Sequence, residues 1–108
     1  MPDDFRGIKF GTKITNIPNL IVQSANRYKK KCRVDNENLQ MAGAKLDRIS
    51  YIFYKDRLSE VWIFFTGREN FETLLSALNS QFGMSLQTKT SVLGTTQGII
   101  GTRQRNTG

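Results

Sequence analysis

Apolar residues recur at the spacing of a helix face in the second half of the chain. Between residues 69 and 82 they form a single stripe made of Phe71, Leu74, Leu75, Leu78 and Phe82. Polar side chains fill the opposite side, and Gly83 follows at the position where helices often end in a left-handed residue. The spacing predicts an amphipathic helix over 69–82 that packs on a sheet.

Two alternating segments directly before this helix predict the sheet. Residues 45–54 and 58–66 read as strands joined by a turn at 55–57. One set of alternate positions is apolar throughout: Ile49, Tyr51, Phe53, Val61, Ile63 and Phe65. The opposite set is also apolar or aromatic, since it contains Ile52, Tyr54, Trp62 and Phe64. One helix cannot cover both faces, so a second layer must come from the N-terminal segment, the C-terminal segment or another copy of the chain.

The remaining segments complete a single domain. Residues 27–34 alternate and predict a third strand, residues 5–10 predict a first strand, and Gly11-Thr12 opens a turn or short helix that stops before Pro18. Strands in succession without crossover helices favour an α+β fold, an antiparallel sheet of about four strands with one amphipathic helix on one face. Residues 1–83 form this domain, and the Thr/Gly-rich residues 84–108 form a weak hairpin or tail.

Positive charge is concentrated in one short run. The chain has 16 Lys and Arg against 9 Asp and Glu, a net charge of +7, and residues 27–33 alone carry five positive charges with no acid. Such a cluster favours an anionic partner. On the predicted strand, four of these cations share a face: Arg27, Lys29, Lys31 and Arg33.

This basic stripe has two interpretations. It would be roughly 20 Å long at about 3.3 Å per residue, enough to contact several phosphates or an acidic surface. Lysine on a strand also commonly protects an exposed sheet edge against aggregation, and that interpretation is the more frequent one. Nucleic-acid binding usually adds aromatic residues that stack on bases, and alternation directs Tyr28 to the opposite face, which weakens that possibility.

Few catalytic groups are present. The chain has no histidine and a single cysteine, which removes the commonest general base, the commonest metal ligand and every disulfide or thiolate-zinc framework. Cys32 is interpreted as a core residue, since no histidine can act as its base. The acidic pairs at 3–4 and 56–60 fit solvated surface. We therefore predict a protein that is not an enzyme and that has no catalytic residues, metal site or cofactor.

The second aromatic face suggests an interface. Tyr54, Trp62 and Phe64 are expected to be exposed or to lie in a contact, because monomers rarely expose large apolar patches. A homodimer that buries the Trp62 side, with the C-terminal segment contributing, is the favoured arrangement. An unknown protein partner and an anionic ligand are the other possibilities.

Three short motifs carry a resemblance to a group of small uncharacterised bacterial proteins. These motifs are FRGIKFGT at 5–12, YKDRL at 54–58 and the opening of the helix at 70–72. The resemblance spans roughly residues 5–83 and implies an exported protein, with no known site residues. A looser topological likeness to sheet-on-helix modules of the β-lactamase-inhibitor and outer-membrane assembly lipoprotein type implies binding rather than catalysis.

The predicted function is a non-enzymatic interaction or accessory module, with an anion- or nucleic-acid-binding protein using residues 27–33 as the alternative. No apolar run approaches the roughly 20 residues that a membrane-spanning helix needs, and no signal peptide is visible after Met1. The expected location is periplasmic or secreted if a signal peptide has been removed, and cytoplasmic otherwise.

Overall fold

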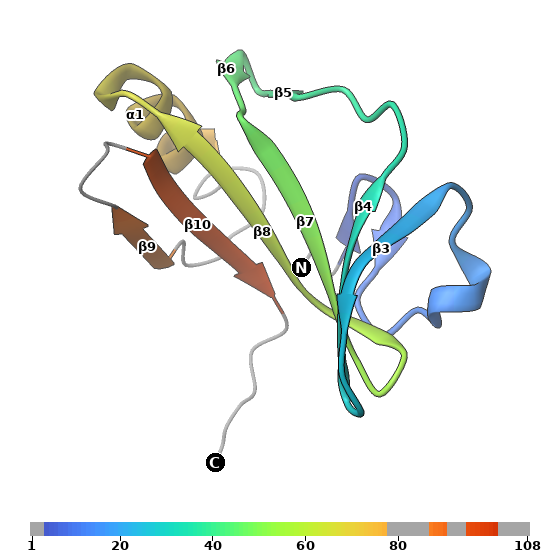
Figure 1. Cartoon of the computed structure of the whole chain (residues 1–108). Helices are drawn as coiled ribbons and strands as arrows, with labels where there is room; N and C mark the ends of the chain where they lie inside the picture. The colour runs from blue at the N-terminus through green and yellow to red at the C-terminus, as the bar shows by residue number, and fades with distance from the viewer. Residues whose placement is uncertain (1–3, 78–86, 91–94, 102–108) are drawn as a thin grey trace.

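The alternating segments assemble into one antiparallel sheet. The computed structural model describes residues 4–77, 87–90 and 95–101, and within them this sheet has six strands in the order β3-β4-β7-β8-β10-β9 (Figure 1). All neighbouring pairs are antiparallel. The strands are β3 (Leu20–Ala25), β4 (Lys29–Val34), β7 (Arg48–Tyr54), β8 (Arg57–Thr66), β9 (Gln87–Thr90) and β10 (Thr95–Gly101). The predicted α+β class is confirmed.

The sheet is wider than the sequence indicated because both ends of the chain add strands. On one side β3 pairs with β4, and on the other β10 pairs with β8 along seven consecutive residue pairs. The strands β9 and β10 form a hairpin with each other. The described part of residues 84–108 therefore belongs to the same sheet as the central strands.

Short hairpins fill the connections. They are β1 (Asp4–Phe5) with β2 (Ile8–Lys9), and β5 (Gln40–Met41) with β6 (Ala44–Lys45), and a 3-10 turn η1 (Ile14–Asn16) precedes Pro18 as predicted. The prediction of one continuous strand over 5–10 is wrong. Arg6 and Gly7 have φ angles of 53° and 84°, and two consecutive left-handed residues reverse the chain between β1 and β2.

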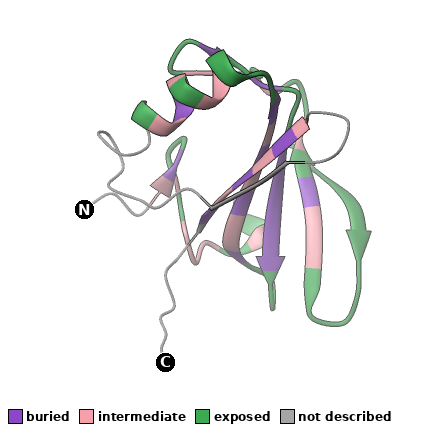
Figure 2. Ribbon diagram, turned by 90° about the vertical axis from the view of Figure 1, so that its left-hand side faces the viewer, coloured by how far each residue is buried: buried purple, intermediate pink, exposed green. Residues whose placement is uncertain are grey.

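One face of the sheet forms the hydrophobic core. The alternation predicted for β7 and β8 is confirmed, because one set of positions is buried in a single cluster: Ile49, Tyr51, Phe53, Val61, Ile63 and Phe65. Cys32 of β4 and Ile100 of β10 extend this cluster sideways. Figure 2 shows the burial along the central strands and the exposed edge strand β3.

Two segments cover this core face. Phe5 packs edge-on against Tyr51, with ring centroids 5.9 Å apart, and the apolar residues of the N-terminal segment follow it onto the core: Ile8, Phe10, Ile14 and Ile17. The helix adds Phe71, which stacks on Phe65 at 6.2 Å, and the fully buried Leu74. The N-terminal segment and the helix therefore lie on the same face of the sheet.

A polar side chain, that of Asn70, adds to the docking of the helix. Helix α1 spans Arg68–Ala77 in the described residues, while Leu78, Phe82 and Gly83 lie outside them. Asn70 accepts a hydrogen bond from the backbone N–H of Lys45 at 3.1 Å and donates one from Nδ2 to the carbonyl of Thr66 at 2.9 Å. These two bonds fix the first turn of the helix against β6 and the end of β8.

Leu74→Ala tests the helix packing. Leu74 has no exposed surface, so its truncation should lower the free energy of unfolding by about 2–5 kcal/mol in urea titrations. Glu72→Ala is the matched control, because Glu72 lies on the exposed side of the same helix and its loss should change stability by no more than about 0.5 kcal/mol. Equal effects of the two changes would contradict the docking of α1.

Candidate functional site

The basic residues of β4 project from the face opposite the core. Cys32 is fully buried and pairs with Tyr51, which places it on the core side. The alternate positions of β4 therefore lie on the other side of the sheet: Lys29, Lys31 and Arg33. Their side chains are exposed or half-buried, which agrees with this placement. Arg27 lies outside β4, in the bend that precedes it.

The position of β4 in the sheet removes the edge-protection interpretation. In the strand order β4 lies between β3 and β7 and is hydrogen-bonded to both. Edge strands use lysine to block pairing with another chain, and an interior strand has no free edge to protect. The cations of β4 therefore need a different explanation.

Strand register brings the aromatic residues to the same face. Lys29 pairs with Tyr54, Ser50 with Trp62 and Arg48 with Phe64. We call this surface the outer face, and define it by its residues on three adjacent strands: Lys29, Lys31 and Arg33 of β4, Arg48, Ser50, Ile52 and Tyr54 of β7, and Glu60, Trp62 and Phe64 of β8. It unites the predicted basic residues of β4 with all three predicted aromatic residues.

Cations lie against the rings of the outer face. The guanidinium carbon of Arg48 is 4.0 Å from the centroid of the Phe64 ring, and Nζ of Lys29 is 5.2 Å from that of Trp62. Each such contact contributes about 0.5–1 kcal/mol at an exposed site. Ile52 points outward on the same face, yet only 2% of its surface is exposed. Among the described residues, the long side chain of Lys29 and the indole of Trp62 lie on this face across β7 at Ile52 and can shield it from solvent.

A second pair of rings extends the aromatic surface toward the β7–β8 turn. Tyr28 and Tyr54 are each 51% exposed, and their ring centroids lie 6.4 Å apart. Arg27 lies 5.9 Å from the Tyr28 ring and Lys55 lies 5.6 Å from the Tyr54 ring. Tyr28 is therefore beside an aromatic residue of the outer face, although alternation alone directed it away.

Negative charge on the outer face is limited to one group. Glu60 is the acid among its defining residues, and it accepts a hydrogen bond from Nε1 of Trp62 at 2.9 Å. This bond holds the indole in one orientation. Lys30, on the core side of β4, is neutralised by Asp56 at 2.6 Å, whereas Lys29 and Lys31 have no ion pair within the described residues. The outer face is consequently positive.

Ser50 adds an unpaired polar group to this face. It lies opposite Trp62, has no exposed surface, and its hydroxyl has no hydrogen-bond partner among the described residues. Buried polar groups are usually paired, so the Ser50 hydroxyl is an exception among the described side chains.

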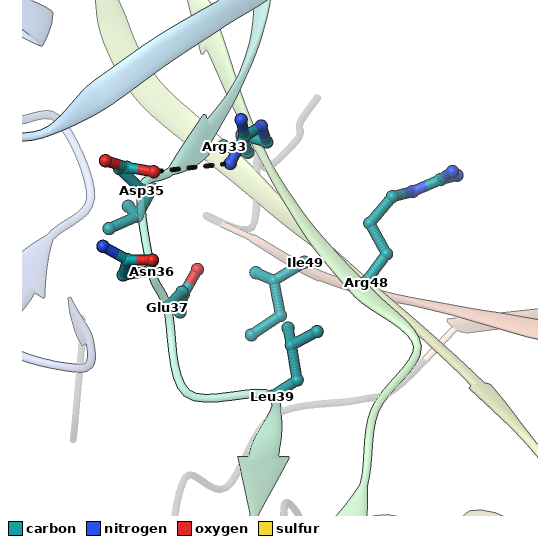
Figure 3. Close-up of a pocket in the computed structure, with 8 residues that line it drawn as sticks. Arg33, Asp35, Asn36, Glu37, Leu39, Arg48 and Ile49 are labelled. Carbon is teal, nitrogen blue, oxygen red and sulfur yellow. Dashed lines mark ion pairs between the residues drawn. The ribbon is translucent and has the colours of Figure 1, made fainter.

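A pocket of about 280 Å³ lies where β4 leaves the sheet and β7 enters it. Figure 3 shows its lining, which consists of Arg33, Val34, Asp35, Asn36, Glu37, Leu39, Arg48 and Ile49. Arg33 and Arg48 of the outer face thus also border the pocket. Arg33 forms a long, exposed ion pair with Asp35 at 3.9 Å, a weak contact that an incoming anion can replace.

Glu37 belongs to a structural cluster rather than to a free acidic site. Its Oε2 accepts hydrogen bonds from the hydroxyl of Tyr51 and from Nη1 of Arg6, the latter at 3.1 Å. Arg6 also donates to the backbone carbonyls of Asn38 and Gln40, at 2.7 and 2.6 Å. Arg6 therefore fastens the loop after β4 to the first hairpin, and this is the role of the FRG motif in the fold.

The other candidate groups have structural roles as well. Cys32 lies in the core as interpreted, and burial raises the pKa of its thiol despite the opposing charge of Lys30. Asp56 is in the β7–β8 turn, paired with Lys30, and Asp3 lies outside the described residues. No three acidic or cysteine side chains of the described ranges gather as metal ligands, and no helix in those ranges is long and apolar enough to cross a membrane.

Comparisons with known proteins add no relative: no protein-family model, curated protein or solved structure matches the chain. The resemblance to small exported bacterial proteins stays a prediction. Arg48 and Ser50 are not among the residues predicted from the sequence, although both alternate in step with Ile52 and Tyr54 along β7. This alternation could have placed both residues on the outer face from the sequence alone.

The buried phenol of Tyr51 predicts a loss of stability in alkali. Burial, and after it the hydrogen bond and charge of Glu37, raise the pKa of Tyr51 above its ordinary value of 10.0, while Arg6 lowers it. In the native state Tyr51 keeps a proton that it releases in the unfolded chain. The contribution of Tyr51 to the free energy of unfolding is therefore complete below pH 10 and is lost as the pH rises above that value.

Urea unfolding of the wild type and of Tyr51→Phe, from about pH 9 to about pH 11, measures this effect. The wild-type free energy of unfolding should fall relative to the variant by up to about 1.4 kcal/mol per pH unit above pH 10. Parallel pH profiles for the two proteins would contradict this prediction, because they would show that the pKa of Tyr51 is the same in the native and the unfolded state.

Proposed function

We propose that this chain is a non-enzymatic binding protein that holds an anionic ligand on the outer face. The supporting observation is the placement of Lys29, Lys31, Arg33 and Arg48 beside half-exposed aromatic rings, with Glu60 as the acid of that face. This proposal combines the two functions expected from the sequence, an interaction module and an anion-binding protein.

The central position of β4 supports a functional role for its charge. Cations two residues apart on one strand face repel one another, and an interior strand gains nothing from them as edge protection. An anion that lies across β4 and β7 would neutralise this repulsion. The weak Arg33–Asp35 pair leaves one guanidinium available for it.

The chemistry of the buried groups supports binding over catalysis. Cys32 and Tyr51 are buried on the core face, away from the outer face, and burial raises the pKa of both side chains. A raised pKa disfavours the thiolate and phenolate forms that nucleophilic catalysis requires. The side chains that face outward are cations and rings, which attract and stack.

A triple variant tests the proposal. Lys29, Lys31 and Arg33 are changed together to Ser, and binding to an oligothymidylate and to inorganic polyphosphate is measured by calorimetry at several salt concentrations. Loss of three phosphate contacts should weaken binding to both polyanions, and should reduce the salt-dependence slope for the oligonucleotide by about 2, at about 0.7 per contact.

The control has the same change in net charge at other positions. Lys9, Lys13 and Lys45 are exposed cations of the N-terminal segment and β6, outside the outer face, and their replacement by Ser should leave most of the affinity intact. An equal loss of affinity in both triple variants would show that binding depends on the net charge alone and not on the outer face. Failure of the wild type to bind either polyanion at low salt would refute the proposed function.

A further inference from the structure

We infer that the ligand of the outer face is a single-stranded nucleic acid, with its bases stacked on Trp62 and Phe64; this inference rests on the proposed function. The two rings occupy alternate positions of β8 and therefore project from the same side of the sheet, about 6.6 Å apart along the strand. Aromatic residues on an open sheet face are a general means of stacking unpaired bases.

Each ring is combined with a positive charge. Arg48 lies 4.0 Å from the Phe64 centroid and Lys29 lies 5.2 Å from that of Trp62. A base can stack on a ring or on a guanidinium plane that lies against the ring, and its phosphate needs a cation, so these residue pairs supply both. An acidic protein surface would use the cations but has no need of the rings, so the combination favours nucleotides.

The indole is held ready for stacking. The hydrogen bond from Nε1 of Trp62 to Glu60 at 2.9 Å fixes the orientation of the ring, and Glu60 itself pairs with the buried Ile52 of β7. Beside the indole, the buried hydroxyl of Ser50 has no partner among the described residues. A rigid ring loses little conformational freedom when a base stacks on it.

The shape of the site favours single strands over duplexes. In a duplex the bases are stacked on each other, and their edges are read by a helix or ribbon inserted in a groove. The outer face is made of the middle strands of a sheet, and its rings are half-buried, so they meet only a base that is already unpaired. The pocket bordered by Arg33 and Arg48 lies next to this surface, at the end of β4 and the start of β7.

The decisive comparison is between an oligothymidylate, a duplex of the same length and inorganic polyphosphate. Wild-type protein should bind the single strand about 10-fold or more tighter than the polyphosphate or the duplex. Trp62 is the sole tryptophan of the chain, so stacking should quench the intrinsic fluorescence. Polyphosphate, which has no bases, should leave that fluorescence nearly unchanged.

Ring variants separate stacking from charge. Trp62→Leu should weaken oligothymidylate binding about 10-fold and leave polyphosphate binding unchanged, while Trp62→Phe should recover most of the loss. Phe64→Leu retains the tryptophan and should weaken binding while keeping the quench. Urea midpoints for each variant show whether the fold is intact, and Phe64→Leu provides the result if Trp62→Leu fails to fold.

Equal affinity for oligothymidylate and polyphosphate, with no effect of either ring variant, would overturn the inference and leave the proposed anion binding in place. Tighter binding of the duplex would also overturn it. The remaining possible occupant of the outer face is a second copy of this chain, which sedimentation equilibrium detects. A dimer that shields Trp62 from iodide quenching, and that the oligonucleotide does not dissociate, would assign the outer face to self-association.

Discussion

The register of the β7–β8 hairpin is the constraint on which the rest of the structure depends. Its turn residues Lys55 and Asp56 have φ angles of 51° and 65°, the left-handed pair of a two-residue hairpin turn. This turn pairs Tyr54 with Arg57, and a bulge after Ile52 shifts the register once. Because side chains alternate, a slip of one residue would turn one strand over relative to the other, and would send either Tyr51 outward or Trp62 into the core.

Neighbouring segments hold this turn from both sides. The backbone N–H of Lys55 donates to the carbonyl of Tyr28 at 2.7 Å, and that of Ile14 donates to the carbonyl of Asp56 at 2.8 Å. Lys30 adds an ion pair to Asp56. The start of β4 and the N-terminal segment thus converge on the turn, so the register that creates the outer face also aligns the basic strand with it.

Local patterns predicted what depends on one strand or one helix, and missed what depends on pairing between segments. The alternation within the predicted strands 45–54 and 58–66 correctly separated core side chains from Trp62 and Phe64. It could not show that β4 is an interior strand, because that position depends on residues 20–25, whose exposed side chains give little apolar signal. The turn at Arg6 and Gly7 was missed because arginine seldom adopts a left-handed conformation, and here its contacts with the loop 37–40 stabilise it.

The outer face combines features that oppose each other in a folded domain. Four consecutive pairing positions of β4 contain three lysines, and an interior strand with this charge is less stable than one with neutral side chains. The contacts of Lys29 with Trp62 and of Arg48 with Phe64 offset part of this cost, and the first of them spans the strand at Ile52. The core face is closed by the N-terminal segment and the helix, so the stability of the domain does not require the outer face to be apolar. The sheet can therefore tolerate a charged aromatic surface at its centre, and an anion bound there would stabilise the native state by mass action.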